Sequence, residues 1–295
     1  MKKFKFVVAA VLLVCLVFSV ACSKESKNNF GKELLTVKSQ LDALNGLKKG
    51  DADIAVIDSV MAGYYMNDTD SFKDYQILEN VVLAEEQYGI AAKKGNDALT
   101  SKINEAIIAL ADTDYKTVAA AYGLTTELLV KADTVNPLAS ASDESWNNVV
   151  KANKLIVGYT LFAPIAYNEG DGENAVFKGF DIDLAKAVVK YLNEKYETTI
   201  VVEFMEIDWD SKEALLENGT IDLVWNGMTI TPERQAAMSI SVPYLANKQV
   251  AVIAKANNEQ FKSATYDEFV KATGDAVIIV EKGSAGEGVV VPSEE

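Results

Sequence analysis

Arg234 is the residue whose type points most directly to chemistry. The 295-residue chain carries 28 lysines and arginines together, and Arg234 is its single arginine. A guanidinium presents a planar fork that can donate two parallel hydrogen bonds to a carboxylate, whereas an ammonium makes one point contact. Arg234 therefore predicts recognition of a carboxylate. The alternative is a surface ion pair with an acid such as Glu233.

Asp58 is the second residue whose setting suggests a function. It ends an apolar run in the segment DADIAVIDS. A carboxylate at the end of a buried strand needs a partner to offset the loss of its hydration. A cationic group of a ligand would be such a partner, and capping of a following helix is the ordinary alternative.

The residue types that are missing exclude several classes of enzyme. The chain has no histidine, and its only cysteines are Cys15 and Cys22. Imidazole metal sites and Ser-His or Cys-His nucleophiles are therefore excluded, and we expect no metal and no cofactor. The net charge of -15 disfavours nucleic acid as a partner. A composition that is 49% apolar and 24% charged is typical of a globular protein with one or two domains.

Residues 1–22 are typical of an export signal. Three of the first five residues are lysine, and the apolar run at 6–20 is short for a membrane span. The run ends Ser-Val-Ala-Cys, which resembles the lipobox of bacterial lipoproteins, so we expect Cys22 to be lipidated and 23–29 to form a polar tether. Ser19 stands where lipoboxes usually carry leucine, which leaves ordinary signal cleavage as the alternative.

Arg234 and Asp58 must be positioned by regular elements. From residue 30 onward, short strand-like runs alternate with amphipathic helical stretches, and this pattern predicts an α/β fold. Leu184, Val188 and Leu192 share one face of a helix expected to begin at Asp181. Residues 131–147 are rich in Ala, Ser, Asp and Asn, which predicts a linker. A second helical block is expected at 99–122, and strands are expected at 52–57, 155–159, 199–204, 221–225, 250–254 and 276–280.

Five ordered motifs carry a family resemblance. They read KLIVGYTLFAPIAY, VFKGFDIDLAKAV, ENGTIDLVWNGMTITPER, SVPYLANKQVAVIAKANN and VIIVEKGSAGE. They resemble the extracytoplasmic amino-acid-binding proteins of ABC transporters, which are family 3 solute-binding proteins. The resemblance implies a two-lobed, periplasmic-binding-protein-like α/β fold of type II, with a hinge and a ligand cleft between the lobes.

The motifs stand in a rearranged order. Segments at 36–59, 85–107 and 120–129 resemble the C-terminal half of the family, yet they precede the N-terminal half. This order predicts a circular permutation, which compact domains with neighbouring termini tolerate. Lobe 1 would then comprise residues 83–249, including the linker at 131–147, and lobe 2 would comprise 30–82 plus 250–295. The alternatives are a truncated or misassembled gene, and a lobe 2 completed by a neighbouring chain.

The resemblance also implies the contacts with the charged groups of an amino acid. Arg234 and Thr229 would bind its α-carboxylate. The backbone carbonyl of Gly227 and the carboxylate of Asp58 would face its α-ammonium. Without the resemblance, the segment NGMT would be interpreted as a turn at the end of a strand, and Asp58 would be interpreted as a helix cap.

Further implied contacts surround the rest of the ligand. Phe162 and Trp209 would form aromatic walls, although aromatic residues more often pack in a core. Ser284 and Ala285 would offer N–H groups at a helix start in the opposite lobe. Tyr159 stands where many relatives carry a polar or acidic specificity residue, and this difference argues against a cationic ligand side chain.

Together these features predict a binding protein and not an enzyme. A free, polar amino acid would close the two lobes, and the closed protein would deliver it to the permease of an ABC importer. The protein would be anchored by lipid on the outer face of the bacterial cytoplasmic membrane. One alternative is a dehydratase acting on a cyclohexadienyl amino acid such as arogenate, with Glu206 or Asp208 as the acid. The other is an extracellular amino-acid sensor, which would need a separate membrane partner.

Overall fold

The computed structural model of the chain describes residues 29–67, 70–170 and 176–291. The predicted signal peptide, the lipidated Cys22 and the tether up to residue 28 lie outside the described residues. Within those residues, no helix is both long and apolar enough to cross a membrane.

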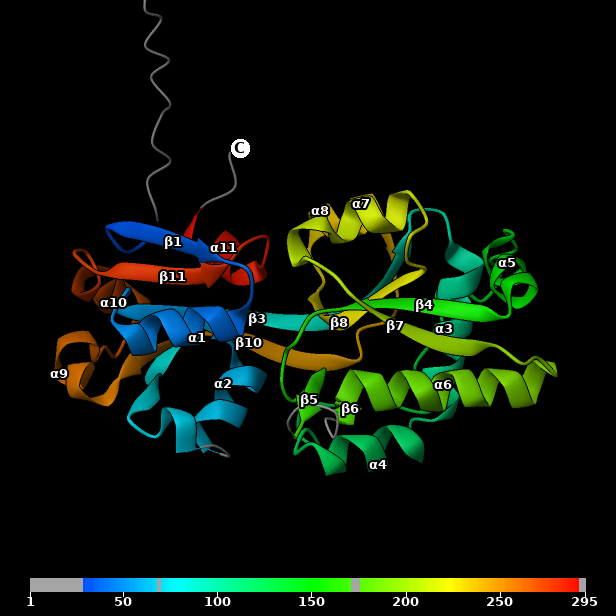
Figure 1. Cartoon of the computed structure of the whole chain (residues 1–295), viewed down its shortest axis with the longest axis horizontal. Helices are drawn as coiled ribbons and strands as arrows, with labels where there is room; N and C mark the ends of the chain where they lie inside the picture. The colour runs from blue at the N-terminus through cyan, green and yellow to red at the C-terminus, as the bar shows by residue number, and fades with distance from the viewer. Residues whose placement is uncertain (1–28, 68–69, 171–175, 292–295) are drawn as a thin grey trace, which may run out of the picture.

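A mixed β-sheet runs through the described chain (Figure 1). Its strands follow the order β1-β11-β2-β10-β3-β8-β4-β7, with β9 paired to β3, and β5 and β6 form a separate hairpin. The predicted α/β class is confirmed. The strands are β1 Glu33–Val37, β2 Ile54–Asp58, β3 Tyr75–Lys93, β4 Lys154–Tyr159, β5 Tyr167–Glu169, β6 Val176–Lys178, β7 Val201–Glu206, β8 Leu223–Thr229, β9 Met238–Ile240, β10 Leu245–Ala254 and β11 Val277–Glu281.

The helices gather around the two ends of this sheet. Figure 1 shows one group, which we call the terminal lobe, made of α1, α2 and α9 to α11 around β1, β2 and β11. The other group, which we call the central lobe, contains α3 to α8 with β4 to β9. The helices are α1 Gln40–Lys49, α2 Ser59–Asn67, α3 Asp97–Ala109, α4 Asp114–Ala121, α5 Ser145–Ala152, α6 Phe180–Tyr196, α7 Lys212–Glu217, α8 Pro232–Ala237, α9 Asn258–Phe261, α10 Tyr266–Ala272 and α11 Ala285–Val290.

Most predicted elements appear, with shifted limits. The six expected strands correspond to β2, β4, β7, β8, β10 and β11, and the helix expected at Asp181 is α6. The block expected at 99–122 divides into α3 and α4, because the chain turns at 110–113. The longest strand, β3, was not predicted.

The two ends of the described chain lie side by side. The backbone N–H of Asn29 donates to the carbonyl of Val290 at 2.7 Å, and its side chain donates to Val289 at 2.8 Å. Strand β1 pairs with β11 in parallel from Glu33 opposite Val277 onward. The terminal lobe is therefore assembled from both ends of the chain.

Among the strands of the described residues, only β3 and β10 run through both lobes as long paired strands. They pair antiparallel from Leu245 opposite Tyr88 to Ala254 opposite Tyr75. The register shifts on either side of Val250 in β10. Such bulges interrupt the ladder and bend the strand, so the connection between the lobes is locally weakened there.

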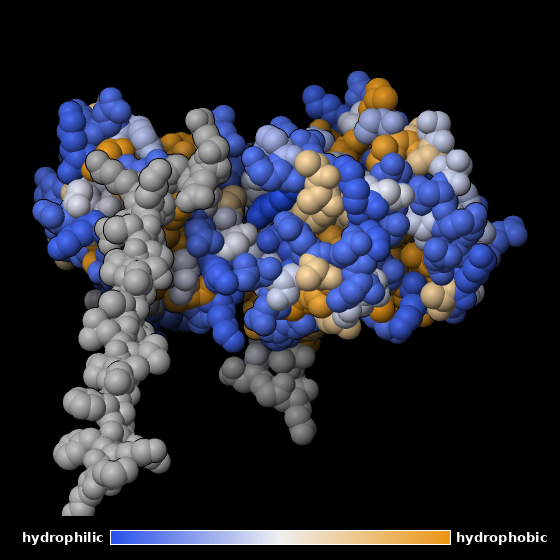
Figure 2. Space-filling view, turned by 90° about the horizontal axis from the view of Figure 1, so that it is seen from above, coloured by the Kyte–Doolittle hydropathy of each residue, from blue (hydrophilic) through white to orange (hydrophobic). Residues whose placement is uncertain are grey.

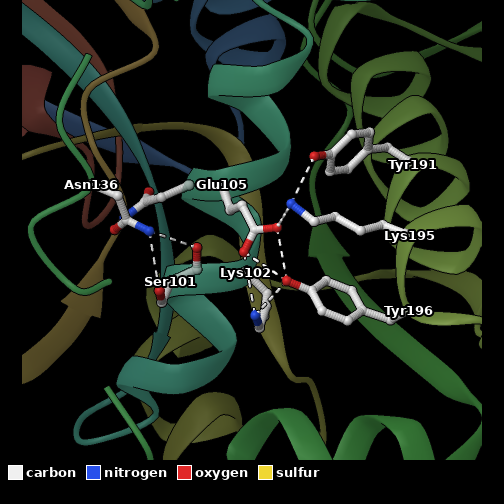
Figure 3. A network of polar contacts seen from close by, with 8 residues as sticks. Ser101, Lys102, Glu105, Asn136, Tyr191, Lys195 and Tyr196 are labelled. Carbon is white, nitrogen blue, oxygen red and sulfur yellow. Dashed lines mark hydrogen bonds and ion pairs between the residues drawn. The ribbon is translucent and has the colours of Figure 1, made fainter. Parts of the chain in front are cut away.

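Hydrogen bonds connect the region predicted as a linker to α3. Asn136 donates to the backbone carbonyl and the hydroxyl of Ser101 at 3.0 and 3.1 Å (Figure 3). Asp143 accepts a hydrogen bond from the N–H of Ala98 at 2.7 Å, in the first turn of α3. Residues 131–144 contain no helix or strand, as predicted, but α5 already begins at Ser145.

The opposite side of α3 is joined to α6 by a polar network (Figure 3). Glu105 of α3 accepts a hydrogen bond from Tyr196 at 2.8 Å and pairs with Lys195 at 2.5 Å. Lys102 donates to the Tyr196 hydroxyl at 2.6 Å. The linker, α3 and α6 thus form one connected unit in the central lobe.

Candidate functional site

Helix α8 begins at the end of the buried strand β8 and holds Arg234 in its first turn. The side chain of Thr231 caps the helix by accepting from the backbone N–H of Arg234, and Pro232 occupies the first turn. Arg234 is only 8% exposed. Its guanidinium donates to the carbonyl of Thr229 at 2.8 Å and to the carbonyl of Gly283 at 3.1 Å. The second of these bonds crosses from the central to the terminal lobe.

Asp58 is buried at the end of β2 and surrounded by side-chain amides. Its carboxylate accepts hydrogen bonds from Gln40, Asn247 and Gln249, the last at 2.7 Å. Burial, together with the nearby charge of Glu86, raises the pKa of Asp58 to about 7. A cation placed beside this carboxyl would favour its charged form.

One pocket brings the two predicted anchors together. Arg234 of the central lobe and Asp58 of the terminal lobe both line it. The surface beyond Arg234 continues into a groove lined by Asp210, Lys212 and Gly283. Figure 2 shows a hollow with a largely hydrophilic rim between the two lobes. Eight of the nine ligand contacts predicted from sequence line the pocket: Asp58, Phe162, Trp209, Gly227, Thr229, Arg234, Ser284 and Ala285.

Gly227 occupies a position that only glycine fits. Its φ is +61°, and an added Cβ would lie 2.7 Å from the ring of Phe162 and 3.0 Å from that of Tyr88. Its N–H donates to the buried carboxylate of Asp181 at 2.8 Å, and this carboxylate also accepts from Tyr244 at 2.7 Å. Burial raises the pKa of Asp181 to about 7. The close approach brings the main chain of β8 against the pocket.

The aromatic residues and the start of α11 line the pocket from different lobes. Phe162 and Trp209 are buried, and the Arg234 guanidinium lies 6.0 Å from the centre of the Trp209 ring. Ser284 caps α11, since its hydroxyl accepts from the N–H of Glu287 at 3.2 Å. Ala285 is the first residue of that helix.

Tyr159 is the one predicted contact that does not line the pocket. Its ring packs against Phe177, with 4.5 Å between the ring centres, and against Phe204 at 6.5 Å. The Tyr159 ring therefore packs outside the lining that Arg234 and Asp58 share.

Several polar residues of the site were missed by the sequence argument, among them Thr160 and Asn226 of the pocket lining. Gln40 and Glu281 line the pocket. Glu86 of β3 accepts hydrogen bonds from Thr229 at 3.1 Å and from Gln249 at 3.0 Å. Gln40 and Glu281 resemble ordinary surface positions in sequence. The placement of Glu281 directly before the predicted helix start was the only available signal.

The described residues include no group of three or more histidine, cysteine, aspartate or glutamate side chains able to hold a metal ion. The chemistry of the pocket is instead that of charge recognition. One guanidinium faces buried carboxyls across a space lined by aromatic rings. Such a site can bind a molecule that carries both an anionic and a cationic group.

A known protein family matches the region of the chain that contains most of the pocket-lining residues. Residues 155–285 match the family model of bacterial extracellular solute-binding proteins, family 3. The match begins at Leu155, so the segment that contains Gln40 and Asp58 lies outside it.

The chain is similar to named amino-acid-binding proteins over part of its length. A probable histidine-binding protein of Neisseria gonorrhoeae is 37% identical over 94 residues, which is 32% of each chain. An arginine-binding extracellular protein of Bacillus subtilis is 36% identical over 125 residues, which is 42% of this chain and 45% of the relative. The chain thus spans less than half the length of these relatives.

Among solved structures, the chain resembles a substrate-binding protein of a polar amino acid ABC uptake transporter from Streptococcus thermophilus. The two are 41% identical over 34% of this chain and 35% of the other, with a TM-score of 0.28.

Proposed function

We propose that this protein binds a free, polar amino acid between its two lobes and delivers it to the permease of an ABC importer. The observation that carries the proposal is the meeting of Arg234 and Asp58 in one buried pocket. The guanidinium suits an α-carboxylate, and the amide-bound carboxyl suits an α-ammonium. The relatives named for histidine and arginine binding support the same class of ligand.

In this proposal the charged ends of the ligand are shared between the lobes. Arg234, Thr229 and the Gly227 carbonyl act from the central lobe, and Asp58 acts from the terminal lobe. A ligand that contacts both lobes stabilises only the closed arrangement of the lobes. Binding therefore shifts the population toward the closed arrangement. The bulges in the β3–β10 pairing support a hinge near residues 84–88 and 248–252.

Contacts between the lobes support a closed state of this kind. The Arg234 guanidinium donates to the Gly283 carbonyl at 3.1 Å, and Lys212 donates to the same carbonyl at 3.3 Å. Lys282 and Asp210 form an exposed ion pair at 2.6 Å across the cleft. An importer would then recognise the closed protein and not the open one.

We further propose that the chain is a circular permutation of the family fold, with lobe 1 at 83–249 and lobe 2 at 30–82 plus 250–295. The hydrogen bond between Asn29 and Val290 supports this, since neighbouring ends could be joined without rearranging the core. To test it, residues 131–291 would be joined by a short Gly/Ser linker to 29–130, so that every described segment is kept and only the order changes. This reordered chain should fold and bind the same ligand. A reordered chain that fails to fold would contradict the permutation.

Calorimetric titration of the protein with the twenty amino acids and cystine tests the proposed function. At least one should bind with micromolar or tighter affinity, about 8 kcal/mol, with closure measured by small-angle X-ray scattering. The absence of binding to every amino acid, or turnover of arogenate to an aromatic product, would contradict it. Glu206 and Asp208, the acids considered for such turnover, are exposed and do not line the pocket.

A further inference from the structure

A third carboxyl lines the pocket beside the two charged anchors. Glu281 is the last residue of β11, is only 5% exposed, and lines the same space as Arg234 and Asp58. Recognition of an amino acid's two charged backbone groups uses one cation and one carboxylate. Glu281 therefore has no role in binding the α-carboxylate and the α-ammonium.

The surroundings of Glu281 do not neutralise it. Among the described residues, none of the ion pairs within 4.0 Å involves Glu281. The guanidinium of Arg234 is directed at the Thr229 and Gly283 carbonyls. The ammonium of Lys212 donates to the carbonyls of Trp209 at 3.2 Å and Gly283 at 3.3 Å.

Burial and the neighbouring charge of Asp58 raise the pKa of Glu281 to about 8. The charges of Lys212 and Arg234, and a hydrogen bond from Gln40, act in the opposite direction but do not compensate. A buried carboxyl in this setting is costly to ionise unless a cation is brought to it. A ligand can bring that cation.

The balance of charge in the lining points the same way. One guanidinium stands against two buried carboxyls, Asp58 and Glu281. A zwitterion satisfies only the first pair, whereas an amino acid with an additional positive charge satisfies all three groups. The ring of Phe162 in the same lining provides a flat face that attracts a guanidinium or ammonium group.

We propose that Glu281 binds the side chain of the ligand and that the pocket takes an amino acid whose side chain carries a positive charge. This inference rests on the proposed function and narrows it to one ligand class. It also replaces the expectation drawn from Tyr159, which packs on Phe177 outside the pocket lining.

The test compares two ligands of equal length and different charge, L-arginine and L-citrulline, by calorimetric titration. The wild-type protein should bind arginine at least tenfold more tightly than citrulline. Glu281→Gln should reduce this preference to less than about threefold, because the amide keeps the size of the side chain and removes its charge. Glu281→Asp should retain a preference for arginine. Glu259→Gln, an exposed substitution on α9, is the matched control and should behave as wild type.

The outcomes separate this inference from the proposed function. If the wild type binds citrulline or another neutral amino acid as tightly as arginine, or if Glu281→Gln keeps the full preference, the role of Glu281 is wrong while amino-acid binding stands. If no amino acid binds, both proposals are overturned. A thermal melt of each variant establishes that a loss of preference does not arise from unfolding.

Discussion

Replacing Arg234 by lysine keeps the positive charge of the site and removes its fork. The guanidinium makes two directed hydrogen bonds to carbonyls, at 2.8 and 3.1 Å, from a side chain that is 8% exposed. These bonds fix its orientation toward the pocket. A lysine ammonium is a point donor on a flexible stem. It can therefore neither reproduce the hydrogen bonds to both carbonyls nor hold a carboxylate through two parallel bonds.

The size of the effect follows from the number of bonds lost. A hydrogen bond to a charged group contributes about 1.5 to 3 kcal/mol, and about 1.4 kcal/mol corresponds to a tenfold change in affinity. Loss of one such bond to the ligand carboxylate should therefore weaken binding by about 10- to 150-fold. Loss of the bond to Gly283 of the terminal lobe should add to this, because it also holds the lobes together.

Calorimetric titration with the tightest amino acid measures the change. Lys116→Arg is the control. Lys116 lies on α4, outside the pocket lining, and forms an exposed ion pair with Asp112. This substitution should leave the affinity unchanged. If Arg234→Lys melts like the wild type and binds within threefold of it, Arg234 does not bind the carboxylate and the assignment of the site is wrong.

Four more predictions concern separate parts of the molecule. Asp58→Asn should weaken amino-acid binding at least tenfold by titration, about 1.4 kcal/mol, because an amide cannot pair with an ammonium; unchanged affinity would leave Asp58 as a structural residue. The pKa of Asp181 is raised to about 7, so between about pH 4 and pH 7 the folded state holds a proton that the unfolded state has released, and rising pH favours unfolding. Asp181 should account for a fall in stability of up to about 4 kcal/mol over this range, in addition to falls from Asp58 and Glu281, whose pKa values are also raised. Asp181→Asn should therefore reduce the difference in stability between pH 5 and pH 8 in urea titrations, and an equal difference in both proteins would rule this out. Lys282→Ala, which removes the exposed pair with Asp210, should change affinity about twofold at most and lose its effect in high salt, and a large salt-resistant loss would contradict a minor role. Cys22→Ala should abolish palmitate labelling and release the protein from cells, whereas continued labelling would place the lipid elsewhere.

Local sequence was sufficient for the regular elements. Periodic apolar residues such as Leu184, Val188 and Leu192 predicted α6, and compact apolar runs predicted six strands. Strand β3 was missed because its 19 residues include the acids Glu85 and Glu86 and no sustained apolar run. Its pairing with β10 and β8 stabilises it as a strand, and this pairing involves residues far apart in the chain.

The site was only partly accessible from sequence. The rarity of arginine drew attention to Arg234, and the family motifs supplied eight residues that line the pocket. Glu281 and Gln40 carry no distinguishing local pattern, and Tyr159 was assigned by position alone although its ring packs on Phe177.

The amino-acid sequence by itself therefore determined which segments are helices and strands, and which residue types are available for binding. Only the tertiary structure decided which of these residues meet. Asp58 and Arg234 are separated by more than half of the chain, and their approach depends on β2 pairing with β10 and on α8 following β8. Periodicity is set by neighbours a few residues away, whereas a pocket is set by packing between distant segments, and no local pattern encodes that packing.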